Sequence, residues 1–176
     1  MRPRFGEEEK KAISDYMEED GFITEFRRTE VFEKMIADYT QSKHCIVVNN
    51  GTISLTLAAM AAGIGLGDEV IVPNYTMIAT PNSVKLIGAT PVFDDVEPGP
   101  LCLDMELVKK AITPKTKAII LVAANGRYPE AGISQYLELA QEHNLTLIED
   151  AAQAMGSFYP DGRHMGAAGL IGCFSF

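Results

Sequence analysis

At 176 residues, 47% hydrophobic and 22% charged, the chain is long enough to bury a core and has the composition of a globular protein. Its 15 basic and 24 acidic residues give a net charge of −9, which argues against a nucleic-acid or anionic-membrane surface but not against an anion bound in a pocket. No apolar run reaches the roughly 18 residues of a membrane span, the charged start MRPRFGEEEKK lacks a signal-peptide core, and three scattered cysteines predict reduced thiols in a cytoplasmic protein.

The predicted elements alternate along most of the chain. Two helices with charged faces are expected at residues 7–20 and 29–41, and the β-branched run HCIVVNN predicts a strand at 44–50. The remaining elements are helix 51–64, strand 68–73, helix 80–89, strand 90–96, helix 103–112, strand 116–124, helix 133–143, strand 145–150 and strand 170–176. Strands such as AIILVAA are continuously apolar, which is typical of a parallel sheet covered on both faces. The pattern therefore predicts an α/β fold.

The first candidate ligand segment is VVNNGTISL, where a strand runs into Gly51 and Thr52 at the start of a helix. Free N–H groups, the helix dipole and the hydroxyls of Thr52 and Ser54 suit a phosphate dianion, and a glycine allows close approach of the backbone. The alternative is ordinary N-capping by Thr52 or Asn50.

The second segment is LTLIEDAAQAMGS, in which Glu149 and Asp150 end a strongly apolar strand. At least one of these carboxylates should be partly buried, and a buried carboxylate needs a cationic or N–H partner. A protonated pyridine nitrogen is such a partner, and Gln153 could bind a nearby ring oxygen. The alternatives are a capping aspartate and a magnesium ligand.

The third segment is VPNYTMIATPNSV, a loop with Tyr75, Thr76, Met77 and Asn82 that opens a helix, and taken alone it is better explained as an ordinary strand-to-helix turn. Other site classes have little support. The histidines share no metal-ligand spacing, no metal site is expected, and no Gly-x-Ser-x-Gly elbow of a serine hydrolase is present.

Taken together and in this order, these segments resemble the DegT/DnrJ/EryC1/StrS family of pyridoxal-phosphate-dependent sugar-nucleotide aminotransferases. The matching stretches are GFITEFRRTEVFEKMIADY, NNGTISLTLAA, GDEVIVPNYTMIATPNSVKLIGATPVFDDV and IEDAAQAMGSFYPDGRHMGAAGLIGCFSF. The stretches NYTMIATPN and NGRYPE are most similar to perosamine-synthase-like members of the family. The resemblance implies the aspartate-aminotransferase (type I) large domain, with a mostly parallel sheet and helices on both faces. It also implies a homodimer.

The resemblance assigns roles by position. Gly51, Thr52 and Ser175 would hold the phosphate of pyridoxal 5'-phosphate, and Asp150 would pair with its pyridine nitrogen. Gln153 would contact the phenolic oxygen, and Met77 stands at the ring-stacking position, which is usually aromatic in the family. The implied substrate is a nucleotide-linked 4-keto- or 3-keto-6-deoxy sugar, with glutamate as the amino donor.

Aminotransfer also needs a lysine that holds the cofactor and moves a proton, and in the family it would fall about four residues beyond Phe176. None of the nine lysines occupies an equivalent position: Lys10, Lys11, Lys34, Lys43, Lys85, Lys109, Lys110, Lys115 and Lys117. We therefore expect residues 1–176 to be an N-terminal arm and a partial large domain, without the C-terminal small domain and without activity of their own. The alternatives are a non-catalytic piece that binds a ligand or partner, and a relative of the lysine-less sugar dehydratases.

Overall fold

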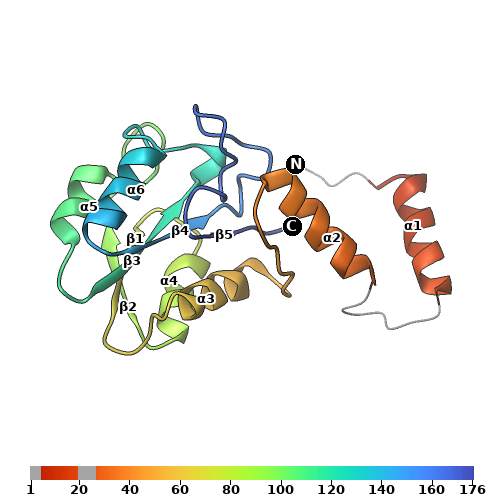
Figure 1. Cartoon of the computed structure of the whole chain (residues 1–176), viewed down its shortest axis with the longest axis horizontal. Coiled ribbons are helices and arrows are strands. Elements are labelled where there is room, and N and C mark those ends of the chain that lie inside the picture. The colour runs from red at the N-terminus through yellow and green to blue at the C-terminus, as the bar shows by residue number, and fades with distance from the viewer. Residues whose placement is uncertain (1–4, 20–26) are drawn as a thin grey trace. The chain divides into compact units, whose positions relative to one another are not determined.

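The computed structural model describes residues 5–19 and 27–176 (Figure 1). The chain divides into two compact units, Met1–Val47 and Val48–Phe176. No helix within the described ranges is long and apolar enough to cross a membrane.

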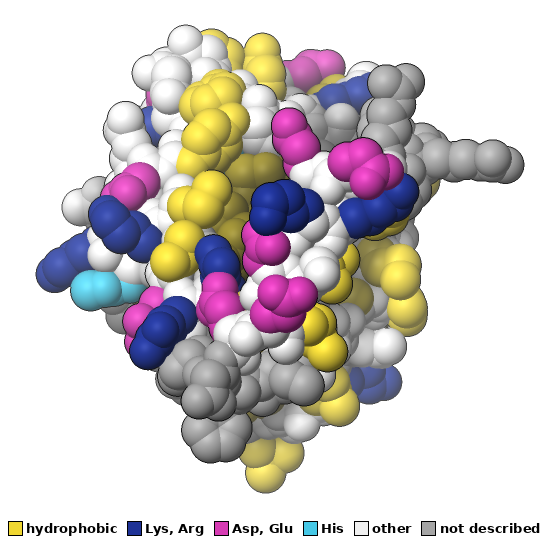
Figure 2. Space-filling model, turned by 90° about the vertical axis from the view of Figure 1, so that its right-hand side faces the viewer, with side chains coloured by type: hydrophobic (Ala, Val, Ile, Leu, Met, Phe, Trp, Pro, Cys, Tyr) yellow, Lys and Arg dark blue, Asp and Glu magenta, His cyan; other side chains and the backbone are white. Residues whose placement is uncertain are grey.

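The first unit contains the two predicted N-terminal helices, α1 (Glu7–Glu18) and α2 (Arg27–Thr40). The first turn of α1 carries three glutamates, which the positive end of the helix dipole favours. α1 has no buried residue, and Thr40 is the only buried residue recorded for α2. Large apolar side chains of both helices are exposed, namely Ile13, Met17, Val31, Met35 and Tyr39. Figure 2 shows hydrophobic side chains interspersed with charges of both signs on the surface.

The strand predicted at residues 44–50 is wrong, because this segment is irregular and pairs with no strand in the described part of the chain. Ile46 is 79% exposed, and the Val47 N–H donates to the Glu33 carboxylate at 2.8 Å instead of to a strand. β-branched residues favour an extended backbone, but a strand also needs a neighbouring strand to accept its hydrogen bonds.

The second unit is built on a parallel sheet of five strands in the order β2-β1-β3-β4-β5. The strands are β1 (Glu69–Pro73), β2 (Thr90–Asp94), β3 (Thr116–Val122), β4 (Thr146–Asp150) and β5 (Ile171–Cys173). The strand predicted at 170–176 is thus confirmed only over residues 171–173. β4 ends at Asp150, which pairs with Cys173, so the chain beyond Cys173 has no partner strand to follow.

Helices cover both faces of this sheet (Figure 1). α3 (Gly51–Ala61) and α4 (Ala79–Leu86) pack on one face, and α5 (Met105–Ala111) and α6 (Ile133–Glu142) pack on the other. Successive strand residues alternate between the two cores: Ile119 and Leu121 face α5 and α6, whereas Ala118 and Ile120 face α3 and α4. Because both faces are buried, the strands are apolar throughout, which confirms the predicted α/β class.

The strand order creates a switch point beside β1. The chain moves from β1 to β2 on one side and then places β3 on the other side of β1. In open parallel sheets, ligands bind beyond the carboxyl ends of the strands at such a point, where neighbouring loops diverge.

Candidate active site

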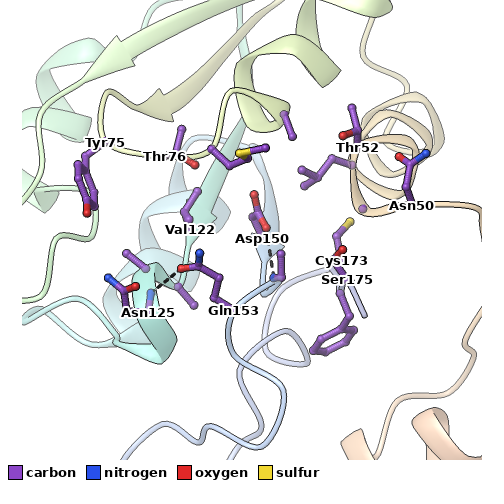
Figure 3. Close-up of a pocket in the computed structure, with 18 residues that line it drawn as sticks. Asn50, Thr52, Tyr75, Thr76, Val122, Asn125, Asp150, Gln153, Cys173 and Ser175 are labelled. Carbon is purple, nitrogen blue, oxygen red and sulfur yellow. Dashed lines mark hydrogen bonds between the residues drawn. The ribbon is translucent and has the colours of Figure 1, made fainter. Parts of the chain in front are cut away.

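A cavity of about 600 Å³ lies at this edge of the sheet (Figure 3). Its walls come from the ends of β1, β3, β4 and β5 and from the N-terminus of α3. All six residues predicted to bind a cofactor line it, although they are up to 124 positions apart: Gly51, Thr52, Met77, Asp150, Gln153 and Ser175. The fold therefore brings the predicted site residues together in one place.

The N-terminus of α3 forms one end of the cavity. Asn50 caps the helix, its Oδ1 accepting from the Ile53 N–H at 3.0 Å, so the capping alternative is confirmed for this residue. In the described part of the chain, the N–H groups of Gly51 and Thr52 have no protein acceptor, and they belong to the positive end of the helix dipole. Capping by Asn50 and anion binding are compatible because they use different N–H groups.

Gly51 also lies against the segment that follows β5. A Cβ at Gly51 would stand 3.0 Å from Ser175 Cβ and 3.2 Å from its Oγ. The glycine is therefore required for close approach, and it brings the Ser175 hydroxyl next to the start of α3. The side chains of Thr52 and Ser175 thus both lie at the end of the cavity formed by the start of α3 (Figure 3).

Asp150 lies near the middle of the cavity and is only 5% exposed. Its Oδ2 accepts from Thr80 Oγ1 at 2.8 Å, and its Oδ1 has a long contact of 3.3 Å to the Ala152 N–H. None of the salt bridges among the described residues involves Asp150. Burial raises the pKa of Asp150, while the hydrogen bonds from Thr80 and Ala152 oppose that rise. A carboxylate in this state favours a cationic N–H donor in the cavity.

Gln153 forms the opposite end of the cavity together with Asn125 (Figure 3). The Asn125 N–H donates to Gln153 Oε1 at 2.9 Å. A backbone N–H can only donate, so the oxygen must face Asn125 and the amide NH₂ of Gln153 is left to donate elsewhere. This arrangement offers a donor to an anionic oxygen in the cavity.

Met77 and Tyr75 line the side of the cavity beyond β1. Their side chains are 71% and 51% exposed, so both present apolar surface that a flat ligand ring could cover. A thioether packs favourably on a ring face, as the prediction for Met77 requires.

Glu149, the neighbour of Asp150, belongs to the other face of the sheet and has a structural role. It is 2% exposed and accepts from the Tyr159 hydroxyl and from three backbone N–H groups, those of Gly166, Ala168 and Gly169. Strand alternation separates the two carboxylates. No group of three metal-ligand side chains occurs within the described ranges, so the magnesium alternative gains no support.

Sequence reasoning missed three residues at or beside the cavity: Thr80, Asn125 and Cys173. Thr80 lies 70 positions from its partner Asp150, so only the fold brings them together. Asn125 stands in a left-handed conformation (φ 55°) within a short 3₁₀ turn, Ala124–Gly126, after β3. The turn residues Asn-Gly are the one feature that could have drawn attention to it.

Comparison with known proteins assigns the family. The sequence profile of the DegT/DnrJ/EryC1/StrS aminotransferase family matches residues 3–176. The chain belongs to this family. GDP-perosamine synthase of Caulobacter vibrioides is 44% identical over 174 residues, which cover 99% of the chain and 46% of that protein. The chain thus spans about half the length of the curated relatives it matches.

Solved structures of family members confirm the fold. An aminotransferase from Psychrobacter cryohalolentis has a TM-score of 0.93 and 39% identity, covering 99% of this chain and 44% of that one. NtdA of Bacillus subtilis, solved with bound cofactor PMP, has a TM-score of 0.80 and 31% identity, covering 86% and 35%. The predicted family, the aminotransferase fold and pyridoxal phosphate as the cofactor of the family are all confirmed.

Proposed function

We propose that this chain forms the cofactor-binding part of a pyridoxal-phosphate-dependent aminotransferase acting on a nucleotide-linked keto-6-deoxy sugar, with glutamate as the amino donor. The observation that carries the proposal is Asp150, a buried carboxylate that lines the cavity and has no ion-pair partner among the described residues. The similarity to GDP-perosamine synthase supports the sugar class.

The residues present fit the cofactor. Asp150 would accept from the pyridine N–H, and Gln153 would donate its free NH₂ to the phenolic oxygen. The N–H groups of Gly51 and Thr52, with the hydroxyls of Thr52 and Ser175, would hold the phosphate. Met77 would pack on the ring. The bound cofactor supplies an electron sink, which Asp150 maintains by keeping the pyridine nitrogen protonated.

No lysine is among the residues that this chain contributes to the cavity, within its described part. We propose that the lysine that moves the proton, and the small domain, belong to sequence outside these residues, so that this chain alone binds the cofactor without turning it over. We further propose a cytoplasmic homodimer. The exposed apolar side chains of α1 and α2 support association, since such surface is costly in water.

Cofactor binding is tested by titrating the chain with pyridoxamine phosphate, which has no aldehyde to react with surface lysines, and following its fluorescence. Asp150→Asn removes the charge with little change of shape and should weaken binding about tenfold or more. Asp38→Asn, at an exposed position on α2, is the matched control and should leave binding unchanged. Equal affinity of the Asp150→Asn variant and the unaltered chain would contradict the proposal.

The substrate class is tested on a longer protein that contains this chain together with the remaining half of the family fold. Nucleotide-linked keto-6-deoxy sugars are offered with glutamate, and with glutamine as the alternative donor, while the keto acid product is measured. Turnover that depends on both the sugar nucleotide and glutamate supports the proposal. Cofactor binding without any amino transfer would instead favour the non-catalytic ligand-binding alternative, which the lysine-free lining also suits.

A further inference from the structure

Two linked threonine hydroxyls, of which that of Thr80 is fully buried, lead to Asp150. Thr80, in the first turn of α4, has no exposed surface, and its Oγ1 donates to Asp150 Oδ2 at 2.8 Å. Thr76 Oγ1 lies 2.8 Å from Thr80 Oγ1. A hydroxyl has one proton, and an ionised carboxylate can only accept. Thr80 therefore donates to Asp150, and Thr76 must donate to Thr80, which gives the linked hydroxyls one direction.

The backbone of Thr80 is held from both sides. Its N–H donates to the carbonyl of Met77 at 3.0 Å, and its carbonyl accepts from Ser83 Oγ at 2.7 Å. Ser83 is also fully buried. The backbone that carries the Thr80 hydroxyl is thus held by contacts that do not involve Asp150.

The Thr80 hydroxyl donates to only one of the two carboxylate oxygens of Asp150. Oδ2 has the short bond from Thr80, whereas Oδ1 has only the 3.3 Å contact to Ala152. An unrestrained aspartate rotates about its terminal torsion, which has broad and nearly twofold preferences. The bond from Thr80 to Oδ2 restricts this rotation, so that Oδ1 remains able to accept a hydrogen bond from a donor in the cavity.

We propose that Thr80 is a positioning residue that orients the Asp150 carboxylate toward the pyridine nitrogen of the cofactor. The inference rests on the proposed binding of pyridoxal phosphate at this cavity. Thr80 is not among the residues that line the cavity, so we expect it to act on the cofactor only through Asp150. It should therefore affect cofactor affinity only where the cofactor has a ring nitrogen for Asp150 to bind.

The test compares two ligands that differ at one ring atom, pyridoxamine phosphate and its 1-deaza analogue, in which C–H replaces the ring nitrogen. Thr80→Val keeps the shape and removes the hydroxyl, and it should weaken binding of pyridoxamine phosphate about tenfold while leaving affinity for the 1-deaza analogue unchanged. Thr80→Ser retains the hydroxyl and should restore most of the affinity. Thr80→Ala is a second hydroxyl-free variant in case valine disturbs folding.

Thr116→Val is the matched control. Thr116 is another buried threonine of the same unit, whose hydroxyl accepts from the Thr113 N–H at 2.9 Å, and it does not line the cavity. This variant should bind both ligands like the unaltered chain.

Two results would overturn the inference: an equal loss of affinity for both ligands in Thr80→Val and Thr80→Ala, which indicates general disruption, or no loss for either. A separate result concerns the proposed function itself. If the unaltered chain bound both ligands equally well, Asp150 would not recognise the ring nitrogen, and both proposals would fail.

Discussion

Glu149 organises the segment that precedes β5, and its replacement by glutamine provides a sharp test of the packing described above. Its Oε1 accepts from the Tyr159 hydroxyl at 2.7 Å and the Gly166 N–H at 2.9 Å. Its Oε2 accepts from the N–H groups of Ala168 at 2.7 Å and Gly169 at 2.5 Å. Four donors thus converge on one buried carboxylate.

Glutamine has nearly the same shape but replaces one of these oxygens by an NH₂ group. In the better orientation, the NH₂ faces Tyr159, whose hydroxyl can rotate to accept, but the Gly166 N–H is left without an acceptor. An unpaired buried N–H costs about 1–3 kcal/mol, and the remaining bonds lose their charge assistance. Glutamine is neutral, so the variant no longer has the energetic cost of burying a charge, and this offsets part of the loss. We expect Glu149→Gln to lower the free energy of unfolding by about 3 kcal/mol.

The measurement is urea-induced unfolding of the chain, followed by circular dichroism, with the slope of the transition compared between variants. Glu138→Gln, at an exposed position on α6, should change stability by less than about 0.5 kcal/mol. A change of that small size in Glu149→Gln would refute the view that the carboxylate stabilises this segment by accepting from all four donors.

Three further predictions concern other sites. Gly172→Ala should lower the free energy of unfolding in urea by more than about 3 kcal/mol, because the new Cβ would lie 1.7 Å from the Gly166 carbonyl oxygen. Gly65→Ala, where a Cβ meets nothing within 4 Å, is the control, and equal effects would contradict the reasoning. Burial raises the pKa of Asp150, so its ionisation opposes folding and the chain loses stability as the pH rises through that pKa. Asp150→Asn should therefore stabilise the ligand-free chain by about 1 kcal/mol at pH 8, with the difference shrinking toward acidic pH; a difference independent of pH would count against this. Cys45 should be alkylated fastest by iodoacetamide at pH 8, because it is only half-buried; burial and Glu33 raise the pKa of its thiol as well, but burial raises the pKa of the other two cysteines to about 11. Equally rapid labelling of all three, read by mass spectrometry, would disprove this.

The α/β class and the position of most elements could be predicted from the sequence. Apolar runs such as residues 116–122 and 146–150 specify strands buried on both faces, and that information is local. The motifs around Gly51 and Asp150 could be recognised for the same reason, because a glycine with hydroxyls at a helix start and a strand that ends in carboxylates are each visible in a few residues, although the strand predicted before Gly51 is wrong.

The two strand predictions that failed wholly or in part, at residues 44–50 and 170–176, have a common cause. HCIVVNN has strand propensity but no partner strand among the described residues, and pairing is a property of the fold and not of the segment. LIGCFSF pairs only as far as β4 extends, so Ser175 reaches the cavity from irregular backbone and not from a strand.

By itself, the sequence determined the fold class, the family and six residues of the candidate site, since each depends on short stretches of chain. The residue pattern left open which of two adjacent carboxylates faces the cavity, and the family resemblance assigned Asp150; only the tertiary structure shows the physical reason. Strand alternation turns Asp150 toward the cavity and Glu149 toward a cage of donors on the opposite face. The structure also decided that Thr80 supports Asp150 across 70 residues, because hydrogen bonds between distant segments form only where the sheet and its helices bring the side chains together.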